Sequence, residues 1–462
     1  MRNRPSTALA CLLAPCFAAA ERFWLHRVER LPEPRTFEIV HYHTVEAGAE
    51  VSLQGPIALE GIREKLDTKI QLHLLHSSLM GHISADHFCC SKQDVAEKKC
   101  ATEGTLMLTD GPDALTLDAK SFSPSRMDQY APWKVKTTGL YFLAISNCGE
   151  TDFSSGKFTS GEISVMTKAG YLPAEEKPKM AFYMYLALGY VGLLCCWAAY
   201  CWAWTDVLFL IHHFISCALI CGALEATCWF TSLAHWNWTG HRWWSMIALA
   251  TLGTTIKQGV CYALLLLACL GVGVTQPKPS TKTLMQIFAL TVAFVVTDTY
   301  RQFAMAERST VGSDMTTFST VLVVAPGSFF VSCLYVWILQ ALQETISELN
   351  STKQIVKAEL YRYLRLALGS VCAVVIALVA YETAVVRQTD LSQNWDSRWI
   401  FTDAASHCMF FFLSMVLMYL WRPNETSQQI AYSQQIGDDD GIELGNRMDM
   451  DLDEEEGVST LE

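Results

Sequence analysis

The stretch TTIKQGVCYALLLLACLGVGV, residues 254–274, has the length and apolar character of a membrane span, but a lysine, Lys257, interrupts it. A lysine near the centre of a bilayer costs about 2.5–3.5 kcal/mol on insertion scales. Such a residue is tolerated where it faces the interior of a helix bundle and meets carboxylates or water. The stretch therefore predicts a helix that packs among other helices, with Lys257 directed toward its neighbours.

Apolar segments of similar length occur on both sides of this stretch, and they predict an all-α bundle of seven transmembrane helices over residues 179–423. The chain has 462 residues, of which 51% are hydrophobic. An odd number of spans places the two ends of the bundle on opposite sides of the membrane, and the basic residues of the loops weakly favour a cytosolic C-terminus. The seven segments are 180–204, 207–232, 243–274, 284–303, 319–343, 361–386 and 399–421.

Residues 1–20 are typical of a cleaved signal peptide rather than of an uncleaved anchor. Arg2 and Arg4 precede an apolar run that is too short to span a bilayer, and small residues at 18–20 suit cleavage before Glu21. The sequence therefore predicts that residues 21–178 enter the lumen of the secretory pathway.

Residues 21–178 contain short runs in which apolar and polar residues alternate, which is typical of strands with one buried face. Several such strands in one segment of this size predict a β-sandwich domain. The runs are IQLHL (70–74), ALTLD (114–118), WKVKT (133–137) and GEISV (161–165).

Four cysteines, Cys89, Cys90, Cys100 and Cys148, lie in this lumenal part of the chain. The lumen is oxidising, so one or two disulfides are expected. Adjacent cysteines rarely bond to each other, so we expect Cys89 or Cys90 to pair with Cys100 or Cys148. The sequence leaves open which of these pairs forms.

Lys257 shares the predicted spans with several titratable residues. Lys257 is expected to meet Glu225 or Asp403. One alternative is a buried ion pair that fixes the register of the helices. The other is a hydrated polar cavity, open to ions or lipid headgroups, whose candidate residues are Glu225, Lys257, Asp403 and His407. The further acidic residues in apolar segments are Asp298 and Glu382.

Asp403 and His407 are four residues apart, so a regular helix presents them on one face. The pair is suited to proton transfer or to half of a zinc site, which would also need His212 or His213. The sequence has no HxxxH pair to complete a three-histidine set. We therefore predict that the protein is not an enzyme and has no catalytic residues, no bound metal and no cofactor.

Three further segments have predicted roles. The sequon at Asn237 lies in a lumenal loop and is a glycosylation candidate. Residues 351–365 form either an amphipathic helix on the membrane surface, with basic residues that reach lipid headgroups, or a plain continuation of the sixth span. The acidic segment 424–462 is predicted to be a disordered cytosolic tail, either simply solvated or docked to sorting machinery.

Several stretches, in this order along the chain, resemble one known family. They are FCCSKQDVAEKKC, TGLYFLAISNC, AGYLPAEEKPKMAFYMYLALGY, GALEATCWF, LLLLACLGVGVTQPKP, WILQALQETISELNSTKQIVKAELYRYL and WIFTDAASHCMFFFLSMVLMYLWRPNETSQQIAYSQQI. The set resembles the GOLD-domain seven-transmembrane (GOST) family, also called the lung seven-transmembrane receptor family. The last stretch resembles its transmembrane-protein-87-like branch.

The resemblance implies a lumenal GOLD-like β-sandwich on a seven-helix bundle, and residence in the Golgi membrane. It implies a role in protein traffic, including endosome-to-Golgi retrograde transport, with a lipid-accessible cavity at Glu225, Lys257 and Asp403. The expected partners are a bound membrane phospholipid, a lumenal cargo or partner protein and cytosolic sorting machinery, but no nucleic acid. One alternative is a cation channel that serves Golgi ion or pH homeostasis or carries a mechanosensitive current. A second alternative is an orphan receptor.

Overall fold

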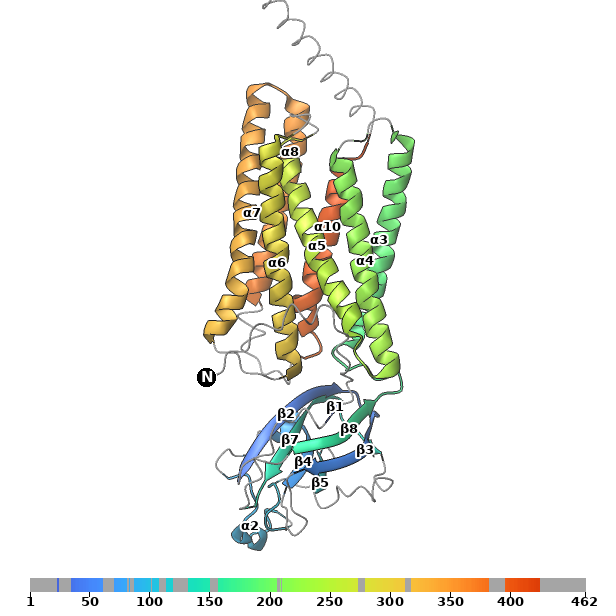
Figure 1. Cartoon of the computed structure of the whole chain (residues 1–462), viewed down its shortest axis with the longest axis vertical. Helices are drawn as coiled ribbons and strands as arrows, with labels where there is room; N and C mark the ends of the chain where they lie inside the picture. The colour runs from blue at the N-terminus through green and yellow to red at the C-terminus, as the bar shows by residue number, and fades with distance from the viewer. Residues whose placement is uncertain are drawn as a thin grey trace, which may run out of the picture.

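The computed structural model describes a two-sheet domain and a helix bundle (Figure 1). The predicted signal peptide at 1–20, Glu382 and the predicted tail at 424–462 lie outside the described residues. The described residues are 23–24, 35–60, 70–80, 83, 87–100, 102–107, 114–118, 132–149, 157–205, 208, 210–272, 279–311, 317–381 and 395–423.

The domain holds two four-stranded sheets, with strand orders β1-β8-β3-β6 and β2-β7-β4-β5. The neighbouring strands are antiparallel. Three of the alternating runs lie within β4, β5 and β8, which confirms the prediction of strands there, and the run at 133–137 is a strand only at its first two residues, which form β6. The strands are β1 Phe23–Trp24, β2 Thr36–Val45, β3 Glu50–Glu60, β4 Ile70–His76, β5 Ala114–Asp118, β6 Trp133–Lys134, β7 Gly139–Asn147 and β8 Lys157–Met166.

A buried histidine joins three strands of the second sheet. His73 on β4 has no exposed surface. Its Nδ1 lies 3.0 Å from the Thr116 hydroxyl on β5, and its Nε2 lies 2.8 Å from the Ser146 hydroxyl on β7. Burial lowers the pKa of His73 to about 3, because a charged imidazole loses its hydration there.

We expect acid to destabilise the domain through His73. Its pKa is about 3 when folded, and 6.5 is the reference value. Its contribution to stability is complete above pH ~6.5 and is lost as the pH falls toward 3, because the unfolded chain takes up the proton. Moving from neutral pH to about pH 5.5 should lower the free energy of unfolding by about 1.4 kcal/mol through this residue. Thermal unfolding of the full chain at both pH values measures the change.

His73→Gln should remove that part of the acid sensitivity, whereas His213→Gln, at an exposed position on the bundle, should not. An acid shift of the same size in His73→Gln and in the unaltered chain would contradict the assignment.

The bundle is built from seven apolar helical segments among the described residues. Six of the helices, α3 to α8, are long and apolar enough to cross a membrane. The last, α10, has 16 residues and continues directly from the π-helical turn η7, which has five. The bounds are α3 Lys177–Ala203, α4 Leu210–Thr239, α5 Trp244–Cys269, α6 Thr281–Val311, α7 Thr317–Ser351, α8 Ile355–Tyr381, η7 Ile400–Ala404 and α10 Ala405–Leu420.

Residues 351–365, for which the sequence left two alternatives, do not form a separate surface helix. Helix α7 ends at Ser351, a short turn follows, and α8 runs without interruption from Ile355 to Tyr381. Lys357, Arg362 and Arg365 therefore belong to the first turns of the sixth span, whereas Lys353 lies in the turn before it.

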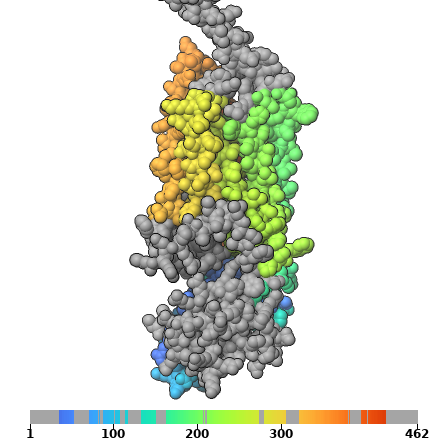
Figure 2. Space-filling view, in the orientation of Figure 1, coloured from blue at the N-terminus to red at the C-terminus, as the bar shows by residue number. Residues whose placement is uncertain are grey.

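Helix α5, which carries Lys257, is the centre of the bundle. It packs against α4, α6, α7 and α10, and most of its residues are buried. The groups α3–α4 and α6–α7 form most of the face of the bundle that the space-filling view shows (Figure 2). A lysine on α5 therefore has protein around it, as the opening stretch of the sequence predicted.

Candidate functional site

Four helices bring polar side chains together inside the bundle. Tyr183 comes from α3, Glu225 from α4, Lys257 from α5 and His407 from α10. We call these four residues the buried cluster. Glu225 and Lys257 lie near the middle of their helices, where water from either membrane surface is most distant.

Lys257 and Glu225 form an ion pair inside the buried cluster, through Nζ and Oε2. The Lys257 side chain is 1% exposed and the Glu225 side chain is fully buried. His407 Nδ1 lies 3.3 Å from Lys257 Nζ and 3.4 Å from Glu225 Oε1. Of the two alternatives raised by the sequence, this geometry is that of a buried ion pair, to which a histidine is added.

Aromatic rings close the cluster on its other sides. The Tyr183 hydroxyl lies 3.2 Å from His407 Nε2, and the Tyr183 ring stacks on Trp229 with centroids 5.7 Å apart. Lys257 Nζ lies 5.4 Å from the centre of the Phe410 ring, within the range of a cation–π contact. Desolvation strengthens the contact between the ammonium and the Phe410 ring, because little water competes for the charge.

A glycine lets α5 approach α4 at this level. A Cβ placed on Gly253 would lie 3.3 Å from the Cβ of Glu225, which is tighter than most such contacts. Gly253 is one turn before Lys257 on α5, so the close approach of the two backbones brings the ammonium within reach of the carboxylate.

Asp403, the fourth cavity candidate, does not join the ion pair of Lys257 and Glu225 but forms another one. Its Oδ2 is 2.8 Å from Lys179 Nζ, and Lys179 also lies 2.9 Å from Glu176 Oε1. Asp403 falls within the π-helical turn η7, whereas His407 lies in the regular helix that follows. The structure thus brings three of the four cavity candidates into direct contact, whereas Asp403 pairs with Lys179 instead.

The arrangement of the cluster suits charge compensation and proton exchange more than metal binding. The imidazole of His407 can donate a hydrogen bond from one nitrogen and accept one at the other, between Glu225 and Tyr183. Among the described residues, no group of three or more His, Cys, Asp or Glu side chains is arranged to hold a metal ion. Sequence reasoning missed Tyr183 and Lys179, because neither a tyrosine in an apolar run nor a lysine at a span boundary stands out.

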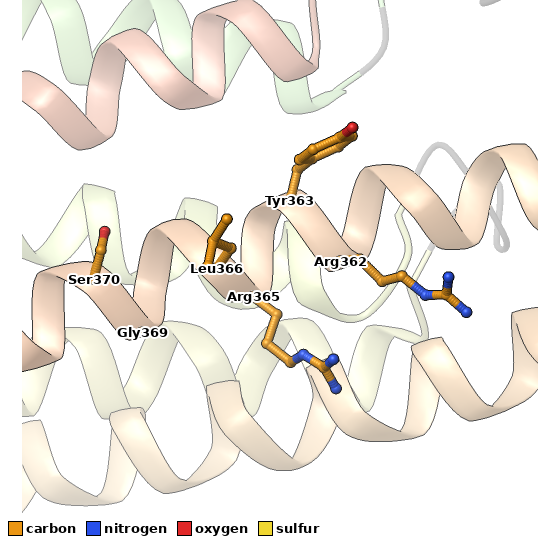
Figure 3. Close-up of a pocket in the computed structure, with 6 residues that line it drawn as sticks. All are labelled: Arg362, Tyr363, Arg365, Leu366, Gly369 and Ser370. Atoms are coloured by element: carbon orange, nitrogen blue, oxygen red, sulfur yellow. The ribbon is translucent and has the colours of Figure 1, made fainter.

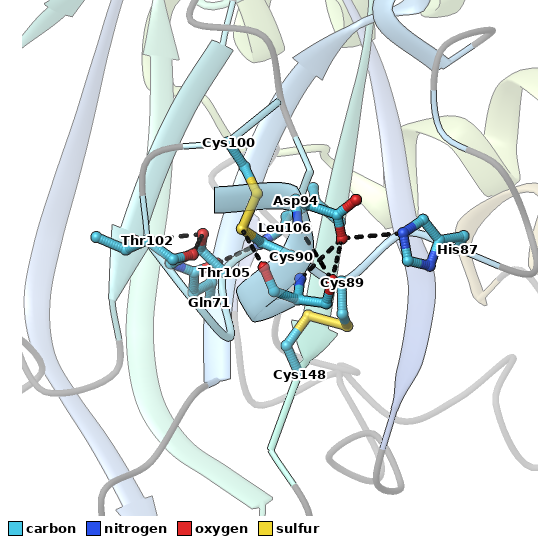
Figure 4. Close-up of a disulfide and its surroundings, with 11 residues drawn as sticks. Gln71, His87, Cys89, Cys90, Asp94, Cys100, Thr102, Thr105, Leu106 and Cys148 are labelled. Atoms are coloured by element: carbon cyan, nitrogen blue, oxygen red, sulfur yellow. Dashed lines mark hydrogen bonds and ion pairs between the residues drawn. A yellow bond between two sulfur atoms is a disulfide. The ribbon is translucent and has the colours of Figure 1, made fainter. Parts of the chain in front are cut away.

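All four candidate cysteines of the domain are disulfide-bonded (Figure 4). Cys89 pairs with Cys148, and Cys90 pairs with Cys100. The short helix α2, Lys92–Ala96, lies between Cys90 and Cys100 and starts with a capping box formed by Ser91 and Asp94. The hydrogen bond from the Ser91 side chain is the main cause that lowers the pKa of Asp94 to about 2, and His87 adds a contact of 3.0 Å.

Asn237, the glycosylation candidate, ties the end of α4 to the segment that leaves the domain. Its Nδ2 donates to the Ala169 carbonyl at 2.9 Å, and its Oδ1 accepts from the Leu172 amide at 3.3 Å. The Tyr171 amide donates to the Asn237 carbonyl at 3.0 Å. We call residues 167–177 the brace.

The brace also holds the end of β2. The Ala174 amide donates to the Thr44 carbonyl at 3.1 Å, and Lys177 Nζ lies 2.8 Å from Glu46 Oε1. Since the brace continues directly into α3, the two-sheet domain is fixed to both α3 and α4.

We expect Asn237 to carry no glycan, because it lies in the last turn of α4, close to the membrane surface, and its side chain packs against the brace. Treatment of the purified full chain with a glycosidase that cleaves N-linked glycans should leave its mobility unchanged. Asn237→Ala should lower the free energy of unfolding by about 1–2 kcal/mol, because two side-chain hydrogen bonds, one of them partly buried, are lost. A glycosidase-sensitive mobility that disappears in Asn237→Ala would contradict this expectation.

Comparisons with known proteins agree with this architecture. Residues 178–428 match the family model described as "GOST, seven transmembrane domain". Transmembrane protein 87B of Homo sapiens is 27% identical over 290 residues, which cover 61% of this chain and 50% of that protein. Transmembrane protein 87A of Xenopus tropicalis is 26% identical over 282 residues, which cover 60% and 50%.

A yeast protein is also similar. Membrane protein PTM1 of Saccharomyces cerevisiae is 23% identical over 346 residues, which cover 71% of this chain and 64% of that protein. The chain spans about half the length of the two transmembrane-protein-87 relatives.

Proposed function

The chain belongs to the GOST seven-transmembrane family, and we propose that it is a Golgi multi-pass membrane protein that acts in protein traffic, including endosome-to-Golgi retrograde transport. In this proposal it is not an enzyme. The two-sheet domain faces the lumen and binds a cargo or partner protein there. The acidic segment 424–462 faces the cytosol and meets sorting machinery.

The observation that carries the proposal is the brace between the domain and the bundle. A domain that hung on a loose linker would move independently of its anchor. Here Asn237 and Thr44 hold residues of the brace by hydrogen bonds, and Lys177 pairs with Glu46. A cargo bound to such a domain would therefore be held at a fixed position above the membrane.

The two disulfides support the lumenal orientation. Disulfides persist in oxidising compartments and are rare in the cytosol. The domain lies at one end of the bundle, and α10 ends at the other end (Figure 1). A lumenal domain therefore places Leu420, and the acidic segment after it, on the cytosolic side.

Cells that lack the protein provide the test. A recycling cargo with a lumenal tag is labelled at the cell surface, and its arrival in the Golgi is timed. Arrival should be slower without the protein, and normal timing should return with the unaltered chain. The double variant Cys89→Ala/Cys148→Ala, which removes the longer cross-link of the domain, should restore it poorly, whereas Lys282→Met, at an exposed site on α6, should restore it fully. Unchanged timing in the deficient cells would contradict the proposal.

The second candidate is a cation channel, and the buried cluster is the observation that favours it. A carboxylate, an ammonium and an imidazole near mid-membrane are groups that ion pathways use. Conduction also needs a continuous wet path, whereas these side chains are tightly packed. Current recorded from the purified chain in liposomes, and altered by Glu225→Gln, would favour the channel. No current, together with slowed retrieval, would favour traffic.

A further inference from the structure

A shallow groove of about 500 Å³ lies along the outer face of α8 (Figure 3). It is near the start of the helix, at the end of the bundle far from the two-sheet domain (Figure 1). The groove does not touch the buried cluster, and the proposed role in traffic does not use it. Its lining residues are Arg362, Tyr363, Arg365, Leu366, Gly369 and Ser370.

The lining separates into a basic end and an uncharged end. Arg362 and Arg365 extend from one side of α8, whereas Leu366 and Ser370 point to the other side and lie deeper along the helix (Figure 3). Between them Gly369 leaves an open floor, because a Cβ placed there would meet no atom within 4 Å. The groove thus has two guanidinium groups at the end nearer the membrane surface. Its other end is an uncharged strip, formed by Leu366, Gly369 and Ser370, which we call the uncharged track.

Arg362 and Arg365 lie within the apolar span of α8, where a positive charge is stabilised by a nearby negative charge. The apolar span of α8 begins at Lys357, so Arg365 lies eight residues into it, or about 12 Å along the axis. Side chains on a helix lean toward its N-terminus, which for α8 is the near membrane surface, so both arginines can reach the headgroup layer.

Protein groups satisfy these charges only in part. Arg362 Nη2 lies 3.4 Å from the Asn350 amide oxygen, which carries no charge. Arg365 is exposed, and no acidic residue of the described part of the chain pairs with it. Glu359 is nearby on α8, but its Oε1 accepts from the Tyr363 hydroxyl at 3.4 Å. A ligand phosphate would supply the missing negative charge.

We propose that this groove binds an anionic phospholipid. The guanidinium groups of Arg362 and Arg365 hold the phosphate, which suits the planar donor geometry of arginine. One acyl chain follows the track past Leu366, Gly369 and Ser370. A lipid accounts for both ends of the groove, whereas free phosphate would use the two arginines alone.

The experiment uses the full chain in nanodiscs of phosphatidylcholine that contain a minor fraction of phosphatidylserine. Native mass spectrometry of the released protein counts the retained lipids. The anionic lipid should be enriched over phosphatidylcholine, and each of Arg362→Gln and Arg365→Gln should weaken its retention about fivefold. Arg422→Gln is the matched control. Arg422 is an exposed arginine two residues after α10 and does not line the groove, so retention should not change.

A second variant tests the uncharged track separately from the charges. Gly369→Phe fills the open floor without altering either arginine, and it should also weaken retention of phosphatidylserine. Monodispersity in size-exclusion chromatography confirms that each variant is folded. Full retention by the folded Arg362→Gln/Arg365→Gln double variant would overturn the proposal. So would equal displacement of the bound lipid by inorganic phosphate and by a short-chain phosphatidylserine, because the groove would then be a site for free anions.

Discussion

Lys257→Met should lower the free energy of unfolding of the full chain by about 3–5 kcal/mol, because it leaves one half of a buried ion pair without its partner. Glu225 is fully buried and its Oε2 is paired with Lys257. Without the ammonium, the carboxylate must either stay charged in a packed interior or take up a proton. Methionine has a volume close to that of lysine, so the change removes charge more than packing.

A double-mutant cycle separates the ion pair from general damage to the bundle. Lys257→Met and Glu225→Gln should each destabilise the chain strongly, and the combined variant should recover much of the loss, because neither charge is then left alone. Detergent-induced unfolding, together with the yield of monodisperse protein after heating, measures each step. Lys282→Met, on the exposed side of α6, is the control and should behave like the unaltered chain.

The cycle also decides between the two alternatives that the sequence left open. In a hydrated cavity, water would solvate Glu225 after the lysine is removed, and Lys257→Met would be well tolerated. Full recovery of folded Lys257→Met protein would therefore contradict the buried pair described here.

Loss of the Cys89–Cys148 disulfide should be the second large effect, about 4 kcal/mol in the chain-entropy model of cross-links. The bond joins residues 59 positions apart, whereas Cys90–Cys100 joins residues only 10 apart. The shorter loop restricts the unfolded chain less, so its loss should cost about 3 kcal/mol. The longer bond also connects the segment around α2 with the end of β7.

Paired alanine variants measure this difference without leaving a free thiol. Cys89→Ala/Cys148→Ala should unfold at a lower temperature than Cys90→Ala/Cys100→Ala when the full chains are heated under the same conditions. In the unaltered chain, neither disulfide should react with a thiol reagent before reduction. The reverse order of stability in the two paired variants would contradict the loop-length argument.

The overall architecture could be predicted from the sequence because its patterns are local. Alternation at positions such as 70–74 depends only on which face of a strand is buried, and it located β4 correctly. The apolar segments likewise located the long helices, with ends that differ by up to eight residues. The direction of the Lys257 side chain, toward the other helices, could be predicted from its charge alone, since lipid cannot solvate an ammonium.

The pairing of Asp403 with Lys179, rather than with the buried cluster, could not be predicted, because Asp403 falls in the π-helical turn at 400–404. A spacing of four places two residues on one face only in a regular α-helix. A π-helical turn carries i→i+5 hydrogen bonds and so changes the direction in which its residues point. No residue type in the segment marks such a turn. The disulfide pairing was also out of reach, since adjacent cysteines can exchange partners without any change in spacing.

The ion pair between Lys257 and Glu225 has a consequence for biosynthesis, since it lies within two consecutive helices. Only residues 240–243 separate α4 from α5, so both charges emerge from the ribosome close together and can enter the translocon as one neutral hairpin. His407 follows 150 residues after Lys257. The lysine therefore has a partner long before translation reaches the last span, and defects at Glu225 should arrest insertion earlier than defects at His407.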